Sequence, residues 1–271
     1  MWNEIVFTVA DFVEEGFADG VYEVSSVIDG ALIDNKAHLA RLQRSLDELS
    51  MPSPNTPGEI EAIQMEMVKR NNLTEGLLYL QVSRGVADRD FNFPTEAKPS
   101  LVMFTQVKKI TENPAAERGI TVVSVPDLRW GRRDIKTVQL LYPSIAKEEA
   151  RAAGADDAWL VEDGFVTEGT SNNAWIVLED GTIVTRQLSH DILHGITRRA
   201  VMRLAAERQI KVEERPFTIE EAQGAKEAFV TSASAFVMPV VEIDGVKIAD
   251  GKPGDLSKRL RGIYLDEAKT F

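Results

Sequence analysis

One lysine of this chain stands in a setting that suits covalent chemistry. In the stretch RWGRRDIKTVQLL, residues 129–141, three arginines precede Lys136 and an apolar run follows it. A lysine amine attacks a carbonyl group only after losing its proton, and nearby positive charge with apolar surroundings favours the neutral form. Lys136 is therefore a candidate nucleophile. The alternative is an ordinary surface lysine that pairs with Asp134.

Two more stretches carry groups that suit a phosphorylated carbonyl cofactor. In GITRR, Gly195 and Ile196 open an amphipathic helix whose free N–H groups would bind a phosphate, and the Thr197 hydroxyl would add a bond. In VTEGTSNN, Glu168 lies between a strand and a turn, where a fixed carboxylate would pair with a heterocyclic nitrogen. The alternatives are an ordinary helix start and a solvated glutamate.

Other chemistries find little support in the composition. Cysteine is absent, which excludes disulfides and thiolate catalysis. His190 and His194 are four residues apart, a spacing that suits a metal pair on a helix, but no HExxH pattern accompanies them, and we expect no metal site. Serine-hydrolase GxSxG and P-loop motifs are also missing.

The net charge of -12 argues against nucleic-acid and anionic-membrane partners. The N-terminus lacks the basic flank of a signal peptide, and no apolar run is long enough to span a bilayer. We therefore expect a soluble, cytoplasmic protein.

The elements that must position these residues alternate between strands and helices. Asp-Gly pairs at 29–30, 163–164, 180–181 and 244–245 separate apolar runs and predict hairpins, largely antiparallel between 157 and 186. Helices are expected over 38–49, 56–70, 145–154, 195–209 and 218–225. The second has a Thr56–Glu59 capping box, and in the first Arg41 points away from the leucine stripe, as an exposed arginine would.

A polar segment with a proline and a closing glycine divides the chain. It predicts two α/β domains of an α+β protein: a small one over 1–109, a linker over 110–119, and a larger one over 120–271 that carries Lys136. The 271 residues, 44% of them hydrophobic, are enough for both cores.

Six stretches occur in one order along nearly the whole chain: FADGVYEV, HLARLQRS, RWGRRDIKT, VTEGTSNN, HGITRR and FVTSASAFVMPV. Together they resemble the fold-type IV pyridoxal-phosphate enzymes, and the D-amino-acid aminotransferases most nearly. The resemblance implies that family's two-domain fold with largely antiparallel sheets. It also implies a transaminase that uses pyridoxal 5′-phosphate, an amino donor and a 2-oxo acid such as pyruvate or 2-oxoglutarate.

The resemblance assigns the catalytic role to Lys136, which would carry the cofactor as a Schiff base and then move the substrate's α-proton. Glu168 would hold the cofactor's ring nitrogen protonated, and Asp157 would be a second acid that supports it. The other cofactor-binding residues implied are Arg41, Ile196, Thr197, Ser232 and Ala233 around the phosphate and Tyr22 beside the ring and the lysine. Ala233 stands where the family often has a hydroxyl.

The substrate residues implied by the resemblance lie in VADRDFNFP and in the first strand. Arg89 keeps the arginine of an R-x-H carboxylate trap, but Phe91 replaces the histidine, which removes one hydrogen bond to a charged group, about 1.5–3 kcal/mol. Tyr22 would also face the substrate, and Ser25 would widen the pocket because it replaces a larger residue. In this family, a homodimer shares its active sites, so Arg89 would serve the Lys136 of the other chain.

These substitutions leave several activities open. A bulkier D-amino acid, or an (R)-amine without a carboxylate, becomes plausible as donor. A branched-chain L-amino-acid transaminase is disfavoured by the Arg89 loop, and an aminodeoxychorismate lyase by the apolar Phe91. A non-catalytic binding protein would leave the pairing of Lys136 and Glu168 without a purpose.

Overall fold

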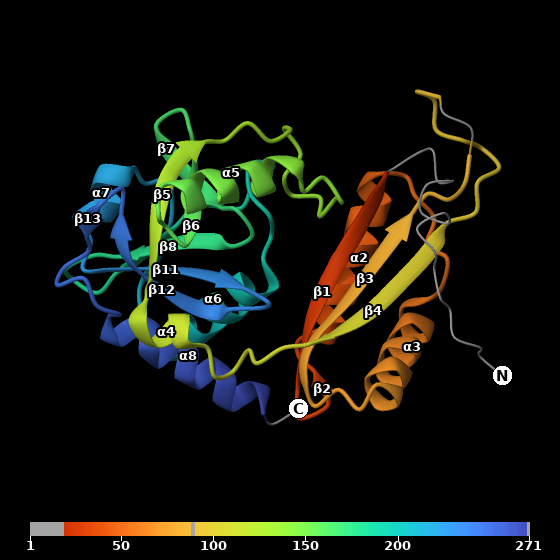
Figure 1. The fold of residues 1–271 in the computed structure, drawn as a ribbon, viewed down its shortest axis with the longest axis horizontal. Helices are drawn as coiled ribbons and strands as arrows, with labels where there is room; N and C mark the ends of the chain where they lie inside the picture. The colour runs from red at the N-terminus through yellow and green to blue at the C-terminus, as the bar shows by residue number, and fades with distance from the viewer. Residues whose placement is uncertain (1–18, 88–89, 270–271) are drawn as a thin grey trace.

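The computed structural model describes residues 19–87 and 90–269, which form two domains beside each other (Figure 1). The small domain is one antiparallel sheet in the order β2-β1-β3-β4, with two helices over one face. Its elements are β1 Gly20–Ile28, β2 Ala31–Leu32, α2 Asn35–Glu48, α3 Pro57–Arg70, β3 Glu75–Ser83 and β4 Ser100–Val107. The Asp29-Gly30 turn has positive φ at both residues, as the sequence predicted.

The two predicted helices of this domain are confirmed. The leucine stripe of α2 is buried against β1 and β3, where it forms the small core with Leu78 and Leu80. The Thr56 side chain accepts from the Glu59 N–H and Glu59 accepts from the Thr56 N–H, so the capping box starts α3 as expected.

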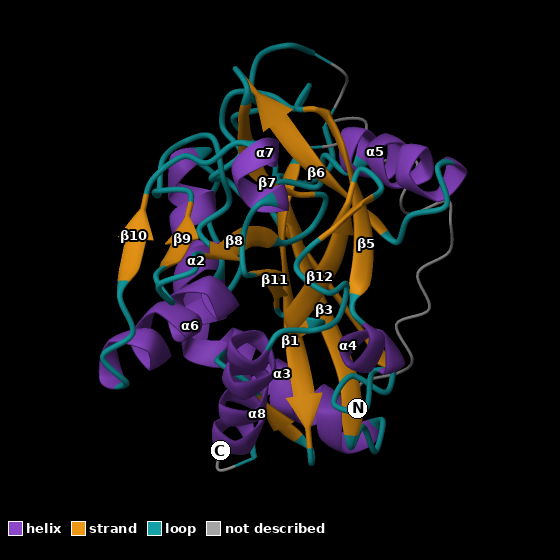
Figure 2. Ribbon diagram, turned by 90° about the vertical axis from the view of Figure 1, so that its left-hand side faces the viewer, coloured by secondary structure: helices purple, strands orange, loops and turns teal. Residues whose placement is uncertain are grey.

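The large domain is built on a nine-stranded sheet in the order β10-β9-β8-β11-β12-β5-β6-β7, with β13 paired to β12. Figure 2 shows its helices around these strands. Its elements are α4 Pro114–Arg118, β5 Ile120–Pro126, α5 Leu141–Ala152, β6 Asp157–Glu162, β7 Phe165–Gly169, β8 Asn173–Val177, β9 Ile183–Thr185, α6 Ile196–Glu207, β10 Val212–Glu214, α7 Ile219–Gln223, β11 Glu227–Ser232, β12 Phe236–Ile243, β13 Val246–Lys247 and α8 Asp255–Ala268.

The pairing within this large sheet is mixed. The three Asp-Gly hairpins predicted here join β6 to β7, β8 to β9, and β12 to β13, all antiparallel. However, β5 pairs in parallel with both β6 and β12, and β9 pairs in parallel with β10. Antiparallel pairs still predominate, because the small sheet, the Asp-Gly hairpins and the β8–β11 and β11–β12 pairs are all antiparallel, so the expectation of largely antiparallel sheets is confirmed.

The expected linker is less free than its polar composition predicted. Residues 114–118 form the short helix α4, and Ile110 is fully buried in the core of the large domain. Glu75 of β3 accepts from the N–H groups of Ile110 and Thr111, and Arg261 of α8 donates to their carbonyl groups. The start of the linker is thus bonded to both domains, which fixes how they meet.

No helix among the described residues is both long enough and apolar enough to cross a bilayer.

Candidate active site

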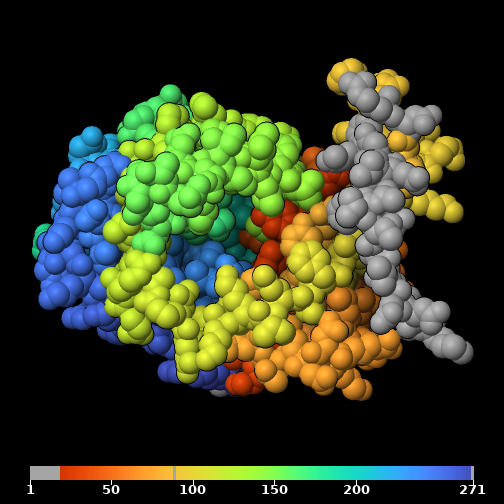
Figure 3. Space-filling model, viewed as in Figure 1, coloured from red at the N-terminus to blue at the C-terminus, as the bar shows by residue number. Residues whose placement is uncertain are grey.

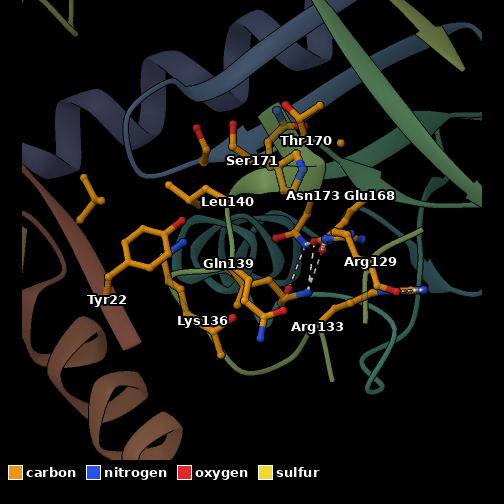
Figure 4. Close-up of a pocket in the computed structure, with 18 of the residues that line it drawn as sticks. Tyr22, Arg129, Arg133, Lys136, Gln139, Leu140, Glu168, Thr170, Ser171 and Asn173 are labelled. Atoms are coloured by element: carbon orange, nitrogen blue, oxygen red, sulfur yellow. Dashed lines mark hydrogen bonds and ion pairs between the residues drawn. The ribbon is translucent and has the colours of Figure 1, made fainter. Parts of the chain in front are cut away.

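A cavity of about 940 Å³ lies between the two domains, and Figure 3 shows its hollow mouth. Walls from both domains line it. Eight of the predicted site residues lie in its lining: Tyr22, Arg41, Lys136, Glu168, Ile196, Thr197, Ser232 and Ala233. Figure 4 shows Tyr22 and Lys136 on one side of this pocket and Glu168 on the other.

The lysine segment belongs to the large domain in sequence but is anchored to the small one in space. Ile135 is buried in the small core, and the Tyr22 N–H donates to the Lys136 carbonyl at 2.9 Å. Thr137 forms a bridge with Val21, so the segment extends the edge of β1. This attachment ties residues 136–138 to the small domain, although the segment runs between β5 and α5 of the large one.

The Lys136 side chain projects into the cavity over an aromatic face. Its Nζ atom lies 4.1 Å from the Tyr22 ring centroid, a cation–π contact while the amine is charged. No carboxylate lies within ion-pair distance of this atom in the part of the chain that the structure describes. The surface ion pair with Asp134, the alternative for this lysine, is therefore not formed.

Asp134 is instead a buried link between three segments. It accepts from Arg132 and from Arg44 of α2, and His190 Nδ1 lies 3.1 Å from it. Burial alone would raise the pKa of Asp134, but the hydrogen bonds from Arg132, His190 and Arg44 and the arginine charge hold it well below its usual range. This link ties the lysine loop to α2, and it gives His190 a hydrogen-bonding role.

The three arginines before the lysine do not present free positive charge. Arg129 pairs with Asp127 and Glu168, Arg132 with Asp134 and Glu48, and Arg133 with Glu162. Carboxylates thus compensate the charges that were expected to favour a neutral Lys136. The feature that still favours a neutral Lys136 amine is the absence of a described carboxylate beside its Nζ atom.

Glu168 lies one residue before the end of strand β7 and is 3% exposed. Arg129 donates to it at 2.6 Å, Asn173 at 2.9 Å, and the Leu193 N–H reaches both its oxygens. Burial raises the pKa of Glu168, while the Arg129 charge and these hydrogen bonds oppose the rise. The alternative of a solvated turn glutamate is wrong, because the side chain is buried and bonded on three sides.

The second acid near Glu168 is Asp127, whereas the sequence interpretation had chosen Asp157. Asp157 itself does not line the cavity, but it accepts from Thr170 and Asn172 and pairs with Lys147, which do. Asp127, at the end of β5, accepts two bonds from the Arg129 side chain that holds Glu168. The sequence did not indicate that Asp127 and Glu168 share a partner, because the two residues are 41 positions apart in the chain and come together only in the folded sheet.

Arg41 is buried, so its interpretation as an exposed arginine is wrong. The face of α2 beside the leucine stripe packs on β1, where Glu23 takes two hydrogen bonds from Arg41 at 2.8 Å each and one from His38 at 2.7 Å. Burial alone would raise the pKa of Glu23, but the paired Arg41 and His38 lower it to about 2. Arg41 also donates to the His194 carbonyl, next to the start of α6.

The start of α6 faces the same part of the cavity. A side chain on Gly195 would meet Asn173 Oδ1 at 2.1 Å, so this close approach requires glycine where a capping hydroxyl would be usual. Ile196 and Thr197 follow, and the buried Thr197 hydroxyl makes no well-formed hydrogen bond with a described residue, although it lies near the Tyr264 hydroxyl. These donors beside Arg41 would suit a phosphate.

The loop 232–235 closes this part of the cavity. Ser26 of β1 donates to the Ala233 carbonyl at 2.6 Å, and the Ser232 hydroxyl accepts from the Ala235 N–H. Ser232 and Ala233 both line the cavity. The loop is therefore held from the small domain, with its backbone beside the start of α6.

Two predicted substrate residues, Ser25 and Phe91, do not line this cavity. Side chains alternate along β1, and Tyr22 and Val24 point into the cavity. Ser25 therefore points to the opposite face of the strand, where it is buried and donates to Asn35. Its interpretation as a cavity residue is wrong. Phe91 is 88% exposed and outside the lining of this cavity, and Arg89 lies outside the described residues.

The polar groups of the cavity fit a phosphorylated heteroaromatic cofactor. Donors suited to an anion gather around Arg41 and the start of α6, and a carboxylate suited to a ring N–H faces in at Glu168. Asn173, which sequence reasoning missed, connects the two because it donates to both Glu168 and the Leu193 carbonyl. Its position two residues beyond the VTEGTS turn was the available signal.

The fold and the sequence both identify the protein class. The profile of the family described as amino-transferase class IV matches residues 20–243. The chain belongs to this family, and it is an aminotransferase. Enzymes of this family depend in general on pyridoxal phosphate.

Particular relatives agree with this assignment. The D-alanine aminotransferase of Bacillus licheniformis is 37% identical over 94% of this chain and 91% of its own. The branched-chain aminotransferase of the thermophilic archaeon Thermoproteus uzoniensis, solved with norvaline, superimposes with a TM-score of 0.82 at 26% identity, over 97% of this chain and 89% of that one. Another solved branched-chain amino acid aminotransferase, with pyridoxamine 5′-phosphate, has a TM-score of 0.86 at 27% identity over 98% and 90% of the two chains.

Proposed function

We propose that this chain is a pyridoxal-phosphate-dependent transaminase that moves an amino group from a D-amino acid to a 2-oxo acid such as pyruvate or 2-oxoglutarate. The observation that carries the proposal is the pair of unlike groups in one cavity. Lys136 presents an amine with no carboxylate partner among the described residues. Glu168 presents a buried carboxylate that accepts hydrogen bonds from three residues. This combination suits an amine nucleophile on one side of a ring and a proton acceptor at the ring nitrogen.

In this proposal, Lys136 holds the cofactor and then carries a proton to and from the substrate's α-carbon through Nζ. Pyridoxal phosphate, when bound, supplies a ring that withdraws electrons from that carbon. Glu168 would bind the ring N–H, and Tyr22 packs beside the lysine. The phosphate would be held by Arg41, the N–H groups and hydroxyl of Ile196 and Thr197, and the loop backbone at Ser232 and Ala233.

The choice of a D-amino acid rests on the D-alanine aminotransferases, which are 36–38% identical over most of the chain. An (R)-amine is a second class of amino donor. Phe91 replaces a histidine that would hydrogen-bond the substrate carboxylate, and it makes that position apolar. A branched-chain L-amino acid donor and the lyase reaction have weaker support, since Arg89 and Phe91 fit neither as well.

A panel of donors with pyruvate and 2-oxoglutarate tests the proposal. D-alanine should give the highest kcat/KM, (R)-1-phenylethylamine a lower one, and L-leucine and aminodeoxychorismate little turnover. A preference for L-leucine would replace the proposed donor class, and release of pyruvate from aminodeoxychorismate without an acceptor would replace the reaction class.

We also propose a homodimer in which Arg89 serves the Lys136 of the other chain. Phe91 is exposed and lies outside the cavity, and the described part of its loop stands at the outer edge of the small domain, away from the large one (Figure 1). Exposed apolar side chains rim the cavity on the opposite side: Leu128, Leu140, Leu141 and Ile145. The position of the described part of this loop and the apolar rim both suit a two-fold interface.

Subunit exchange tests this arrangement. Lys136→Ala and Arg89→Ala should each be nearly inactive with D-alanine. In a mixture, random pairing makes about half of the dimers mixed, each with one intact site, so activity should recover to about a quarter of wild type. A mixture that exchanges subunits, as mass spectrometry would show, but recovers no activity contradicts the shared site.

A further inference from the structure

The buried partners of Glu168 form a chain of alternating charges behind the cavity. Asp127 has a side chain that is 0% exposed, and Arg129 donates to it through Nε at 2.9 Å and through a terminal nitrogen at 2.7 Å. The other terminal nitrogen of Arg129 donates to Glu168 at 2.6 Å. One guanidinium thus bridges two carboxylates, one facing the cavity and one behind it.

The neighbourhood carries one uncompensated negative charge. Glu168, Asp127 and Glu162 are three carboxylates, and Arg129 and Arg133 are two guanidinium groups that pair with them. The formal sum of these five is one negative charge. Of the three carboxylates, only Glu168 lines the cavity.

The bridge has opposite effects on Glu168 at its two ends. Arg129 favours the ionised carboxylate, because its positive charge lies against it. Asp127 draws on the same guanidinium and so limits how strongly Arg129 can do this. Without Asp127, the full Arg129 charge would fall on Glu168; without Arg129, two buried carboxylates would face each other.

We propose that Arg129 and Asp127 are positioning residues for the transamination: Arg129 holds Glu168 ionised and oriented to the cavity, and Asp127 keeps it basic enough to retain the proton of a cofactor ring nitrogen. The proposal rests on the proposed function for the ring nitrogen. Its claim about Glu168 concerns this chain alone, so that part can be measured without cofactor. Thr167 supports the arrangement by donating to Asp127 at 2.7 Å.

Carboxyl-13C NMR on the full-length chain with labelled glutamate, freed of cofactor, tests the claim. The Glu168 signal is identified by its loss in Glu168→Gln. In Arg129→Met its titration should move to higher pH, and in Asp127→Asn to lower pH. Arg129→Lys should restore most of the wild-type midpoint, and Arg118→Met is the matched control because Arg118 pairs with Asp156 away from the cavity.

A merely structural role would not produce shifts of opposite sign. Midpoints that move in the same direction in both variants, or that do not move, overturn the proposal. If Arg129→Met does not fold, Arg129→Gln makes the same comparison, since it also removes the charge.

A second readout relates the pair to the cofactor. Release of pyridoxal phosphate from the loaded protein should be at least about tenfold faster in both Arg129→Met and Asp127→Asn, the loss expected from one weakened bond to a charged group. Release at the wild-type rate would show that the bridge does not act on the ring. If the wild-type protein binds no pyridoxal phosphate, the proposed function fails, while the carboxyl titration still decides the claim about Glu168.

Discussion

The two walls of the cavity hold their key groups in opposite ways. On the large-domain wall, Glu168 is buried and bonded to Arg129, Asn173 and the Leu193 N–H. On the small-domain wall, the Lys136 backbone is fixed to β1, but its amine contacts only the Tyr22 ring among the described charged or aromatic partners. The structure therefore immobilises the carboxylate and leaves the amine able to move.

This difference matches what each group has to do. A group that holds a ring in one place gains from a fixed orientation, because preorganised partners need no rearrangement during reaction. A group that binds a cofactor, releases it and carries a proton must change partners. An ion pair at Lys136 would hinder each of those steps.

The largest effect should come from removing the mobile amine. Lys136→Ala should abolish turnover and the visible absorbance of the loaded protein, because only an amine can bind the cofactor covalently. Lys147→Ala is the matched comparison, since Lys147 is the other lysine that lines the cavity and it pairs with Asp157. Retention of borohydride-sensitive absorbance in Lys136→Ala would mean that another lysine is the anchor.

Neutralising the fixed carboxylate should have the next largest effect. Glu168→Gln keeps the shape but removes the charge that would hold a protonated ring nitrogen, and kcat should fall about 100- to 1000-fold. Glu148→Gln, on the exposed face of α5, is the control. Single-turnover rates would measure the effect, and an unchanged rate would show that the large-domain wall does not act on the ring.

Much of the frame behind these walls was accessible from sequence. Asp-Gly pairs and the Thr56–Glu59 box are local signals, since the residues that form each turn or cap are neighbours in the chain. The order of six short motifs placed Lys136 and Glu168 in one site. The family assignment was therefore obtainable before any coordinates.

What sequence reasoning missed depends on contacts between distant segments. Arg129 donates to Glu168, which is 39 positions away in the chain. Arg41 of α2 donates to Glu23 of β1, so neither pair has a local sequence pattern. The cavity face of β1 was also not determined, which placed Ser25 on the wrong side. Strand alternation excludes Ser25 once Tyr22 is assigned to the cavity.

The phosphate side of the small-domain wall should respond to Arg41→Met in two separable ways. Cofactor affinity should fall, and the apoprotein should lose about 3–5 kcal/mol because Glu23 is left buried and charged. The double variant Glu23→Gln/Arg41→Met should regain much of the stability but not the affinity. Urea unfolding and cofactor titration of the three proteins measure this, and a double variant that binds cofactor normally would remove Arg41 from the phosphate site.

The same ion pair predicts a pH dependence. The pKa of Glu23 is lowered to about 2 in the folded chain, below its ordinary value of 4.5, so its ionisation stabilises the fold above pH 4.5. That contribution should decline as pH falls from 4.5 toward 2. The difference in urea stability between wild type and Glu23→Gln should shrink over this window; a constant difference would contradict the assignment.

The smallest effect should come from the loop outside both walls. Phe91→His adds a donor that favours a carboxylate over an uncharged substituent, so the ratio of kcat/KM for D-alanine to that for (R)-1-phenylethylamine should rise about tenfold. An unchanged ratio would mean that position 91 does not face the substrate in the dimer.

The central claim is that Lys136, the amine left without a carboxylate, binds the cofactor. The most direct measurement is borohydride reduction of the loaded protein followed by trypsin digestion and mass spectrometry. Trypsin cannot cut after a modified lysine, so attachment at Lys136 should give a pyridoxyl peptide spanning 134–147, DIKTVQLLYPSIAK. Attachment at Lys147 would instead give 137–151, TVQLLYPSIAKEEAR, and would contradict the account, as would a reduced protein that carries no pyridoxyl group.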